Sequence, residues 1–236
     1  MKILHTSDWH LGHVLYGYDR TDEQQSMLDQ MVKIAKEEKP DLFLISGDVY
    51  HTAEPKPAVQ KMFNKAVADL CKSCPDMTIV VTAGNHDSGT KHEIFKTPWE
   101  ALNVHMIGKF DKDNLESHIV EVPGKGYVIA LPFTNDRYLP VDIYQQLIDL
   151  ANQKNTDNLP VVFSAHTAIS GVDFTGHEDA GDKRVGGVDV MDVAKIGDGY
   201  DYLALGHIHK PQFLHTGKHN VRYSGSPMAV SFDEAY

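Results

Sequence analysis

The sequence predicts an α/β fold in which two mixed β-sheets pack face to face as a sandwich, with helices on the outside. The first half of the chain alternates short apolar runs with amphipathic stretches of helical periodicity, which is typical of a buried parallel βαβ sheet. The later half holds shorter apolar runs that indicate more antiparallel pairing. The 236 residues, of which 42% are hydrophobic, suit one domain with a large core.

The first half is expected to form three strands, each followed by a polar loop, with a helix between successive strands. The first helix follows Thr21, which is expected to form a capping box with Gln24. The second begins at Pro57, and its apolar residues recur at spacings of three and four. Ligands of such sheets bind beyond the carboxyl ends of the strands, so the loops there are the predicted site. The three strands are residues 2–6, 42–45 and 78–81.

The later half is expected to form one helix, at 141–151, and seven short strands. A stretch rich in glycine and aspartate at 171–187 is expected to be a long loop, and a connection of that length is usually functional or mobile. The strands are residues 104–107, 118–122, 127–131, 159–164, 202–205, 212–215 and 221–224.

Composition and charge exclude several classes of protein. The net charge of −11, from 22 basic and 33 acidic residues, argues against a broad basic face for nucleic acid unless bound cations offset it. No apolar run approaches the roughly 20 residues of a membrane helix, and the N-terminus does not have the pattern of a signal peptide. We therefore expect a cytoplasmic protein without membrane contact, and the two cysteines fit that compartment.

Side chains that can bind metal ions follow five of the predicted strands. In Asp8-x-His10 and His207-x-His209, an extended backbone would direct both side chains to one side. Carboxylate, amide and imidazole ligands without thiolate suit Mn²⁺, Fe²⁺ or Zn²⁺. Seven ligands are too many for one tetrahedral ion, but they suit two ions that share a carboxylate, activate water and clamp a phosphoryl group. The seven are Asp8, His10, Asp48, Asn85, His166, His207 and His209.

Each of these residues also has a structural explanation when it is taken alone. Asp8 or Asp48 could cap the helix that follows it, and Asn85 could serve as a turn residue. A single histidine at a strand end more often belongs to the core than to a metal site. The metal interpretation therefore rests on five such coincidences at one edge of a sheet.

The order and spacing of these motifs resemble the calcineurin-like metallophosphoesterases. Within that family, four segments look like bacterial SbcD-type nucleases, and the resemblance spans essentially the whole chain. The family motifs are Asp8-x-His10, Gly47-Asp48, Gly84-Asn85-His86-Asp87, His166 and Gly206-His207-x-His209. The narrower matches are Thr6-Ser7-Asp8-Trp9-His10-Leu11-Gly12, Ser46-Gly47-Asp48-Val49-Tyr50-His51, Tyr223-Ser224-Gly225-Ser226-Pro227 and Ser231-Phe232-Asp233-Glu234.

The resemblance implies two Mn²⁺ ions, with Mg²⁺, Fe²⁺ or Zn²⁺ as alternatives. His86 would protonate the leaving oxygen or steady the phosphate, and His51 would lie near the scissile phosphate. Asp87 would orient His86 through a ring nitrogen. One ion would be held by Asp8, His10, Asp48 and His209, and the other by Asp48, Asn85, His166 and His207, with Asp48 bridging.

The resemblance also implies an activity and partners. The expected reaction is Mn²⁺-dependent hydrolysis of DNA phosphodiesters, as a double-strand 3′–5′ exonuclease and a single-strand endonuclease in DNA repair, recombination and replication. The expected partners are DNA, an SMC-like ATPase of the SbcC type and a second copy of the chain. Residues 1–236 are expected to be the nuclease domain of a truncated core that lacks a capping domain and partner-binding helices.

Two alternatives stay open. A small-molecule phosphodiesterase or phosphatase would use the same ligands on a compact substrate. However, protein phosphatases of this fold carry Asp-Arg-Gly shortly after Gly-Asp, whereas this chain continues as Val49-Tyr50-His51-Thr52. The other alternative is a DNA-end scaffold without enzymatic activity, whose metals are structural.

Several residues that could suggest function have simpler explanations. Cys71 and Cys74 have redox or zinc spacing, yet they continue the apolar face of the helix that begins at Pro57. That helix could also serve a dimer, although burial in its own core explains it equally well. His13 could meet substrate or be an exposed loop residue. The basic residues near the motif loops, any of which could contact DNA or simply be solvated, are Lys56, Lys91, Arg137, Lys183, Arg184 and Lys210.

Overall fold

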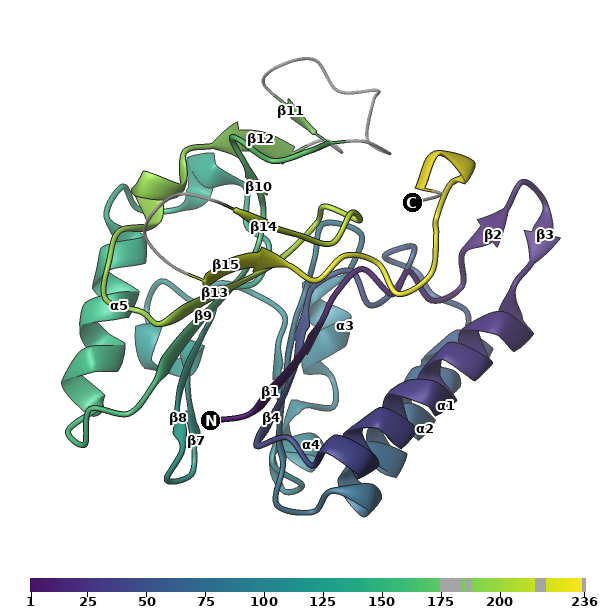
Figure 1. The fold of residues 1–236 in the computed structure, drawn as a ribbon, viewed down its shortest axis with the longest axis horizontal. Coiled ribbons are helices and arrows are strands. Elements are labelled where there is room, and N and C mark those ends of the chain that lie inside the picture. The colour runs from purple at the N-terminus through teal and green to yellow at the C-terminus, as the bar shows by residue number, and fades with distance from the viewer. Residues whose placement is uncertain (175–183, 186–187, 215–219, 235–236) are drawn as a thin grey trace.

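Two β-sheets face each other at the centre of the molecule, and helices cover the outer side of each (Figure 1). Helices α1 (Thr21–Glu38) and α2 (Pro57–Ser73) lie against one sheet, and α5 (Ile143–Lys154) lies against the other. The predicted sandwich with flanking helices is therefore confirmed. The residues that this computed structural model describes are 1–174, 184–185, 188–214 and 220–234.

The first sheet is entirely parallel, as the alternation of strands and helices predicts. Its order is β1-β4-β5-β6, and α1 and α2 connect its first three strands. Thr6 pairs with Ile45, and Ile45 pairs with Val81, so the carboxyl ends of these strands meet at one edge of the sheet. The strands are β1 (Ile3–Thr6), β4 (Leu42–Ser46), β5 (Thr78–Thr82) and β6 (Val104–Ile107).

The second sheet is mixed, and its antiparallel pairs lie at the two edges. Its order is β14-β15-β13-β9-β8-β7, with β14 antiparallel to β15 and β7 antiparallel to β8. The centre is parallel, since α5 crosses over between β8 and β9 and returns the chain in the same direction. The strands are β7 (Ile119–Val122), β8 (Gly126–Ala130), β9 (Val161–His166), β13 (Tyr202–Gly206), β14 (Gln212–Leu214) and β15 (Asn220–Tyr223).

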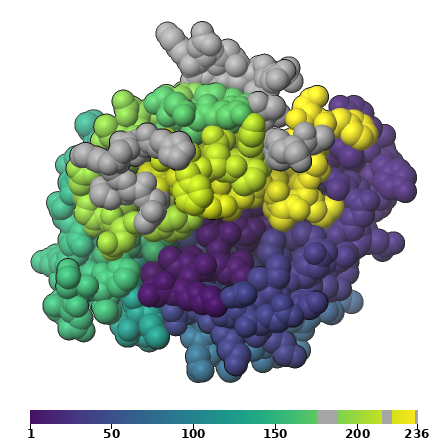
Figure 2. All heavy atoms as spheres, in the orientation of Figure 1, coloured from purple at the N-terminus to yellow at the C-terminus, as the bar shows by residue number. Residues whose placement is uncertain are grey.

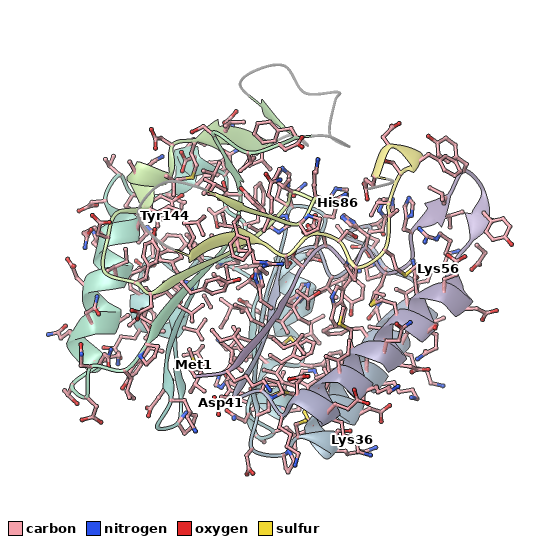
Figure 3. All side chains as sticks on the ribbon, viewed as in Figure 1. Met1, Lys36, Asp41, Lys56, His86 and Tyr144 are labelled. Atoms are coloured by element: carbon pink, nitrogen blue, oxygen red, sulfur yellow. The ribbon has the colours of Figure 1, made fainter. Side chains whose placement is uncertain are left out.

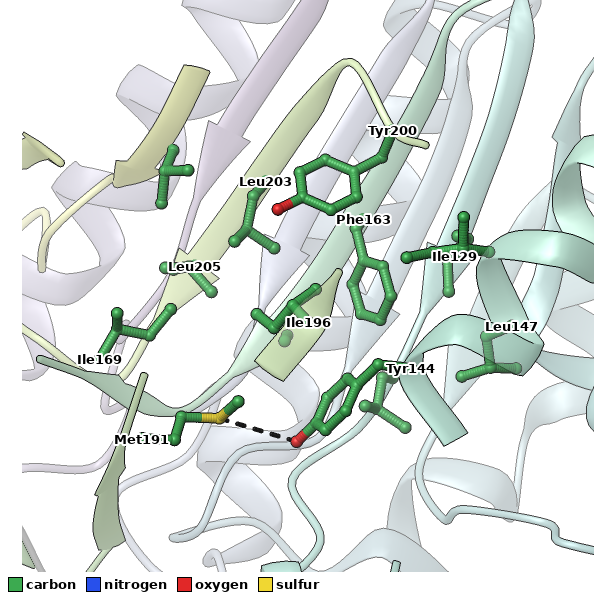
Figure 4. Packing of buried hydrophobic residues seen from close by; sticks show 14 of the residues in the cluster. Ile129, Tyr144, Leu147, Phe163, Ile169, Met191, Ile196, Tyr200, Leu203 and Leu205 are labelled. Carbon is green, nitrogen blue, oxygen red and sulfur yellow. Dashed lines mark hydrogen bonds between the residues drawn. The ribbon is translucent and has the colours of Figure 1, made fainter. Parts of the chain in front are cut away.

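Three apolar layers hold the sandwich together. Successive strand side chains point to opposite faces, so Leu44 packs between the two sheets while Phe43 packs under α1 and α2. A third layer surrounds Phe163 beneath α5, where the hydroxyl of Tyr144 donates a hydrogen bond to the sulfur of Met191 at 3.7 Å (Figure 4). Each fully buried side chain of this size contributes about 1.5–3 kcal/mol of hydrophobic stabilisation. The layers therefore fix both sheets relative to each other.

Short elements between the main ones were not predicted, because most of them are strands of two residues or single helical turns, which have no readable periodicity. Most of the stretch at 171–187 lies outside the described residues, which there include only 171–174 and 184–185. The short elements are β2 (Val14–Leu15), β3 (Tyr18–Asp19), α3 (Gly89–Glu93), α4 (Lys96–Glu100), β10 (Ala168–Ile169), β11 (Arg184–Val185), β12 (Val188–Met191), η1 (Leu115–His118), η2 (Asp136–Tyr138), η3 (Val193–Ile196) and η4 (Phe232–Glu234).

The predicted capping box at the start of α1 is wrong. Thr21 is already the first helical residue, and its backbone N–H donates to the carboxylate of Asp19 at 2.8 Å. Gln24 instead reaches back to the loop after β1, where its side-chain oxygen accepts from the N–H of Gly12 at 3.0 Å and its amide donates to the carbonyl of His13 at 3.3 Å. Asp19, two residues before Thr21, therefore satisfies one of the free N–H groups at the start of α1.

The apolar face of α2 packs against the first sheet, so its burial in the core is confirmed. Cys74 belongs to this core, and its thiol donates to the carbonyl of Ala35 at 3.3 Å, while Cys71 packs against the same cluster. The packing interpretation of both cysteines is confirmed. Within the described part of the chain, no helix has the length and apolar character needed to cross a membrane.

One face of the molecule has a groove along the N-terminal strand. Figure 2 shows the N-terminal residues, in purple, between the half of the molecule that carries the second sheet and the half that carries α1. A groove of 440 Å³ is lined there by Met1, by Ile3 and His5 of the first sheet, and by residues of the second sheet, including Tyr202 and Arg222. It lies away from the loops at the carboxyl ends of the strands.

Candidate metal centre

The seven predicted ligands come together at one end of the sandwich. Asp8 and His10 follow β1, Asp48 follows β4 and Asn85 follows β5, while the histidines lie at the ends of β9 and β13. Figure 3 shows His86 at this end, and Met1 and Asp41 at the opposite end. Six of the seven side chains are buried, and the seventh, that of Asn85, is half-buried.

The backbone at this edge is not extended, which corrects the expected geometry of the two histidine doublets. Asp8, His10, Asp48 and His207 have φ values of 55°, 44°, 51° and 94°. Residues with a side chain seldom adopt this left-handed region, and such strain is usually held in place by surrounding contacts at functional sites. Here the N–H of His10 donates to the carbonyl of Asp48 at 3.0 Å. Tight turns, rather than strand pleating, therefore aim these side chains.

A first group of ligand atoms comes from Asp8, His10 and His209, which lie within 4.8 Å of one another. Nε2 of His10 and Nε2 of His209 are 3.1 Å apart. The carboxylate of Asp8 accepts hydrogen bonds from the Ser7 hydroxyl at 2.5 Å and from the N–H of His207 at 3.0 Å. These bonds orient the carboxylate and leave it within reach of both imidazoles.

A second group surrounds Asn85. Its side-chain oxygen lies 3.0 Å from Nε2 of His166 and 3.1 Å from Nδ1 of His207. Nδ1 of His166 donates to the carbonyl of Ser46 at 2.8 Å, so its Nε2 is the nitrogen available to an ion. His166 thus presents Nε2, and His207 presents Nδ1, beside the side-chain oxygen of Asn85.

Asp48 lies between the two groups. Its Oδ2 is 3.7 Å from Nε2 of His10 and 3.3 Å from Nε2 of His166, while its Oδ1 accepts from the N–H of His86 at 2.8 Å. Asp8 is shared as well, because it also groups with Asp48 and His166 within 4.8 Å. Asp48 therefore lies within reach of a nitrogen from each group, with a second carboxylate beside it.

The buried charges perturb one another strongly. Burial alone would raise the pKa of Asp48, but the imidazoles of His166 and His10 outweigh it and hold that pKa below its usual range. Burial alone would lower the pKa of His166, but the Asp48 carboxylate outweighs it and raises that pKa to about 9. Burial raises the pKa of Asp8 and lowers that of His10. Two carboxylates in such a dry place create a negative centre that favours cations.

The donors fit the predicted metal ions. Both groups combine carboxylate or amide oxygen with imidazole nitrogen, and neither contains sulfur. This donor chemistry suits Mn²⁺, Fe²⁺ or Zn²⁺, and one carboxylate reaches both groups. The arrangement can therefore hold two divalent cations close together.

His86 and His51 lie beside the first group. Nδ1 of His86 donates to the backbone carbonyl of His51 at 2.9 Å, and their rings stack at a centroid distance of 5.6 Å. Burial, together with the nearby imidazoles, lowers the pKa of His51 to about 4. His13 is half-buried, and its ring centroid lies 4.5 Å from that of His51. His13 therefore adjoins the site and is not an exposed loop residue.

The expected contact between Asp87 and the ring of His86 is wrong. The carboxylate of Asp87 instead accepts backbone hydrogen bonds from Gly84 at 2.9 Å, Tyr50 at 2.9 Å and Val49 at 3.1 Å. It ties the loop after β4 to the loop after β5. The ring nitrogen of His86 is already bonded to a backbone carbonyl, which explains why no carboxylate is needed there.

The sequence prediction missed a buried carboxylate in the site. Oε1 of Glu234 lies 2.7 Å from Nδ1 of His209. The segment Ser231-Phe232-Asp233-Glu234 is one of the resembling motifs, but the resemblance assigns it no role. An acidic residue 25 positions after its partner leaves no local spacing signal.

Three of the basic residues near the motif loops have local partners. Lys91 pairs with Glu54, and Lys210 pairs with Asp173. The guanidinium of Arg137 lies 4.7 Å from the ring centroid of Tyr138. Lys183 and the side chain of Arg184 lie outside the described residues.

Comparison with known proteins bears on this site directly. The family model for calcineurin-like phosphoesterases matches residues 1–211. The chain belongs to the calcineurin-like phosphoesterase family. The matched region contains every residue of both ligand groups, from Asp8 to His209.

Curated relatives within this family are nucleases of the SbcD type. The chain is 31% identical over 255 residues to the SbcD subunit of the nuclease SbcCD of Bacillus subtilis, with 100% of this chain and 63% of that protein covered. It is 29% identical to the SbcD proteins of Rhodobacter capsulatus and Escherichia coli K12, with 99% of this chain and 64% and 62% of those proteins covered. The chain thus spans just under two thirds of the length of these relatives.

A solved structure supports the fold. The crystal structure of TT1561 of Thermus thermophilus matches with a TM-score of 0.60 and 12% sequence identity, covering 95% of this chain and 89% of that one. At this identity the likeness concerns the fold alone.

Proposed function

We propose that this chain is the catalytic core of an SbcD-type nuclease that hydrolyses DNA phosphodiesters at two Mn²⁺ ions. The coarser part of this statement, a hydrolase of the calcineurin-like phosphoesterase family, follows from the family membership. The observation that carries the proposal is the position of Asp48, whose Oδ2 lies 3.7 Å from a nitrogen of the first ligand group and 3.3 Å from a nitrogen of the second. One carboxylate between two ligand groups is the arrangement that a two-ion phosphoesterase needs.

The ligand assignment follows the two groups. When bound, a pair of divalent ions activates water and stabilises the charge that develops on the phosphoryl oxygens. The first ion would be held by Asp8, His10, Asp48 and His209, and the second by Asp48, Asn85, His166 and His207.

His86 is proposed to act on the leaving group. Since its Nδ1 donates to the carbonyl of His51, its Nε2 is the nitrogen that can carry a proton to the 3′ oxygen as the phosphodiester bond breaks. His51 stacks beside it and would contact the scissile phosphate. Asp87 would act only through the backbone of the two loops that it joins.

DNA, the activities and the partners are proposed from the similarity to the SbcD proteins of the nuclease SbcCD. The chain would act as a double-strand 3′–5′ exonuclease and a single-strand endonuclease in DNA repair and recombination. It would work as a homodimer with an SbcC-type SMC-like ATPase. A DNA substrate and such a partner also favour a cytoplasmic location. Residues 1–236 would form the nuclease domain of that longer protein.

Hydrolysis of two substrates tests the proposal. The full-length protein with its SbcC-type partner should degrade linear duplex DNA with Mn²⁺, and EDTA should stop the reaction. The 236-residue chain should hydrolyse bis(p-nitrophenyl) phosphate under the same conditions. Hydrolysis of the small ester with no cleavage of DNA by the complex would favour a small-molecule phosphodiesterase. DNA binding with no hydrolysis of either substrate would favour a scaffold.

A further inference from the structure

Glu234 is a buried acid at the edge of the metal centre. It lies in η4 and is only 5% exposed. Burial of an unpaired carboxylate costs several kcal/mol, roughly, so a buried carboxylate normally has partners. Oε1 of Glu234 lies 2.7 Å from Nδ1 of His209, and Oε2 accepts from the N–H of Val230 at 2.8 Å. One of the contacts that stabilise this buried charge is therefore made to a predicted metal ligand.

The contact decides which nitrogen of His209 faces the first ligand group. A carboxylate only accepts hydrogen bonds, so it selects the form of the imidazole that carries a proton on Nδ1. Nε2 then keeps its lone pair, and this atom is the one that lies 3.1 Å from Nε2 of His10. The ring is thus held in the tautomer that a cation requires.

Nδ1 of His209 contacts a charged carboxylate, whereas Nδ1 of His166 and Nδ1 of His86 contact neutral groups. Nδ1 of His166 and Nδ1 of His86 donate to backbone carbonyls, at 2.8 Å and 2.9 Å. A carboxylate makes an imidazole more basic than a neutral carbonyl does, and so strengthens its bond to a cation. Glu234 therefore affects the strength of the ligand as well as its orientation.

The segment that carries Glu234, residues 224–234, is here called the C-terminal strap. In Figure 1 it runs in yellow from β15 to the side of β2 and β3. The ring of Phe232 stacks on that of Tyr16 with centroids 5.1 Å apart and planes at 23°, although both side chains are exposed. The guanidinium of Arg20 donates to the carbonyl of Ala229. The N-terminal half of the chain thus holds the strap in place.

We propose that Glu234 is a positioning residue that fixes the tautomer and orientation of His209 for the first cation, and that the C-terminal strap holds Glu234 there through the stack of Phe232 on Tyr16. The inference rests on the proposed two-ion centre. It adds Glu234, which lies outside the region matched by the family model, to the residues that act on the site, and it assigns Phe232 the task of holding the strap.

Calorimetric titration of the metal-free protein with Mn²⁺ alone tests the inference. In Glu234→Gln the affinity for one of two ions should fall about 10- to 100-fold, while the affinity for the other stays unchanged. Asp233→Asn removes the same charge from an exposed neighbour and should bind both ions like the wild type. Phe232→Ala, at a side chain that is 68% exposed, should lose part of the affinity for the same ion.

Nitrogen NMR of the imidazoles gives a readout that a purely structural role would not change. In the metal-free wild type, His209 should show a proton on Nδ1, and Glu234→Gln should show a mixture of tautomers, since an amide accepts or donates. A wild type that binds no Mn²⁺ would overturn the two-ion centre and this inference with it. If the wild type binds two ions and Glu234→Gln binds each of them with the wild-type affinity, this inference alone is overturned. If Glu234→Gln fails to fold by circular dichroism, unchanged affinity in Phe232→Ala would overturn it.

Discussion

A Cβ atom on Gly84 would lie 2.1 Å from Oδ1 of Asp48 and 2.3 Å from its backbone nitrogen. The backbone nitrogen can move away only if the loop after β4 moves. Oδ1 belongs to the carboxylate that lies between the two ligand groups, so its displacement would disturb the site. The same Oδ1 also accepts the N–H of His86 at 2.8 Å. The loops after β4 and β5 therefore meet at one carboxylate, and this contact is possible only because residue 84 lacks a side chain.

Gly84→Ala is expected to weaken Mn²⁺ binding by about 100-fold or more, since the methyl group displaces a carboxylate that serves both groups. The overpacked contact should also cost about 1–3 kcal/mol in the free energy of unfolding. Calorimetry with Mn²⁺ and urea unfolding measure the two effects. Gly108→Ala is a matched control, because its Cβ would lie 2.1 Å from the carbonyl oxygen of Gly89. That variant should lose stability and keep its metal affinity, and equal metal loss in both would refute the explanation.

Asp87→Asn is expected to lower the free energy of unfolding by about 1–3 kcal/mol, because an amide cannot satisfy all the backbone donors that the carboxylate satisfies. These donors are the N–H groups of Gly84, Val49 and Tyr50. Asp76→Asn, at an exposed position, should leave stability unchanged and serves as the control in urea unfolding.

The same variant separates two roles for Asp87. If the carboxylate joins the loops, stability and Mn²⁺ affinity should both fall in Asp87→Asn. An enzyme with full stability and full metal content but little activity would contradict the loop-joining role of Asp87.

The sequence contained enough information to locate the site, because its ligands follow strands whose periodicity is readable. Asp8, Asp48 and Asn85 end three parallel strands, so the rule that ligands bind at the carboxyl ends predicts their meeting place without any knowledge of distances. The parallel register of the first sheet, with Thr6 beside Ile45, then brings them to one edge.

The contacts that orient these ligands could not be predicted in the same way. The partner of His209 is Glu234, and the partners of Asp87 are backbone N–H groups, which every residue except proline has. The left-handed backbone at Asp8 and His10 depends on hydrogen bonds to the neighbouring loop, so the motif itself does not reveal it. Residue types therefore identified the chemistry, while tertiary contacts decided the geometry.

His5 predicts a dependence of stability on pH. Burial, helped by the charge of Arg222, lowers the pKa of His5 from 6.5 to about 3 in the folded protein. Well above pH 6.5 the imidazole is neutral in both states and contributes no pH dependence. Below that value the unfolded chain takes up a proton that the folded chain does not, so the free energy of unfolding falls by about 1.4 kcal/mol per pH unit. From well above pH 6.5 down to about pH 5, the loss from this residue is about 2 kcal/mol.

His5→Phe should remove the contribution of His5 to the slope of the free energy of unfolding against pH, whatever the effect of the substitution on stability at neutral pH. Urea unfolding of the metal-free protein at several pH values measures the slope in each variant. Tyr202→Phe is the control, because it removes the hydroxyl that lies 2.9 Å from Nδ1 of His5 and keeps the imidazole. Tyr202→Phe should change the free energy of unfolding but preserve most of its slope against pH. Equal slopes in the wild type and His5→Phe would contradict the depressed pKa.

His86→Ala should separate catalysis from metal binding. Asp48 contacts the backbone N–H of His86, which alanine retains, and the imidazole itself bonds to the carbonyl of His51. The metal content should therefore match that of the wild type, while turnover of DNA with Mn²⁺ should fall about 10²- to 10⁴-fold, because the proton donor to the leaving oxygen is gone. Substrates whose leaving groups need no proton, such as nitrophenyl esters, should lose far less activity than DNA. Equal losses on both substrates would indicate that His86 holds the phosphate instead, and a fall in metal content would place its ring among the ligands.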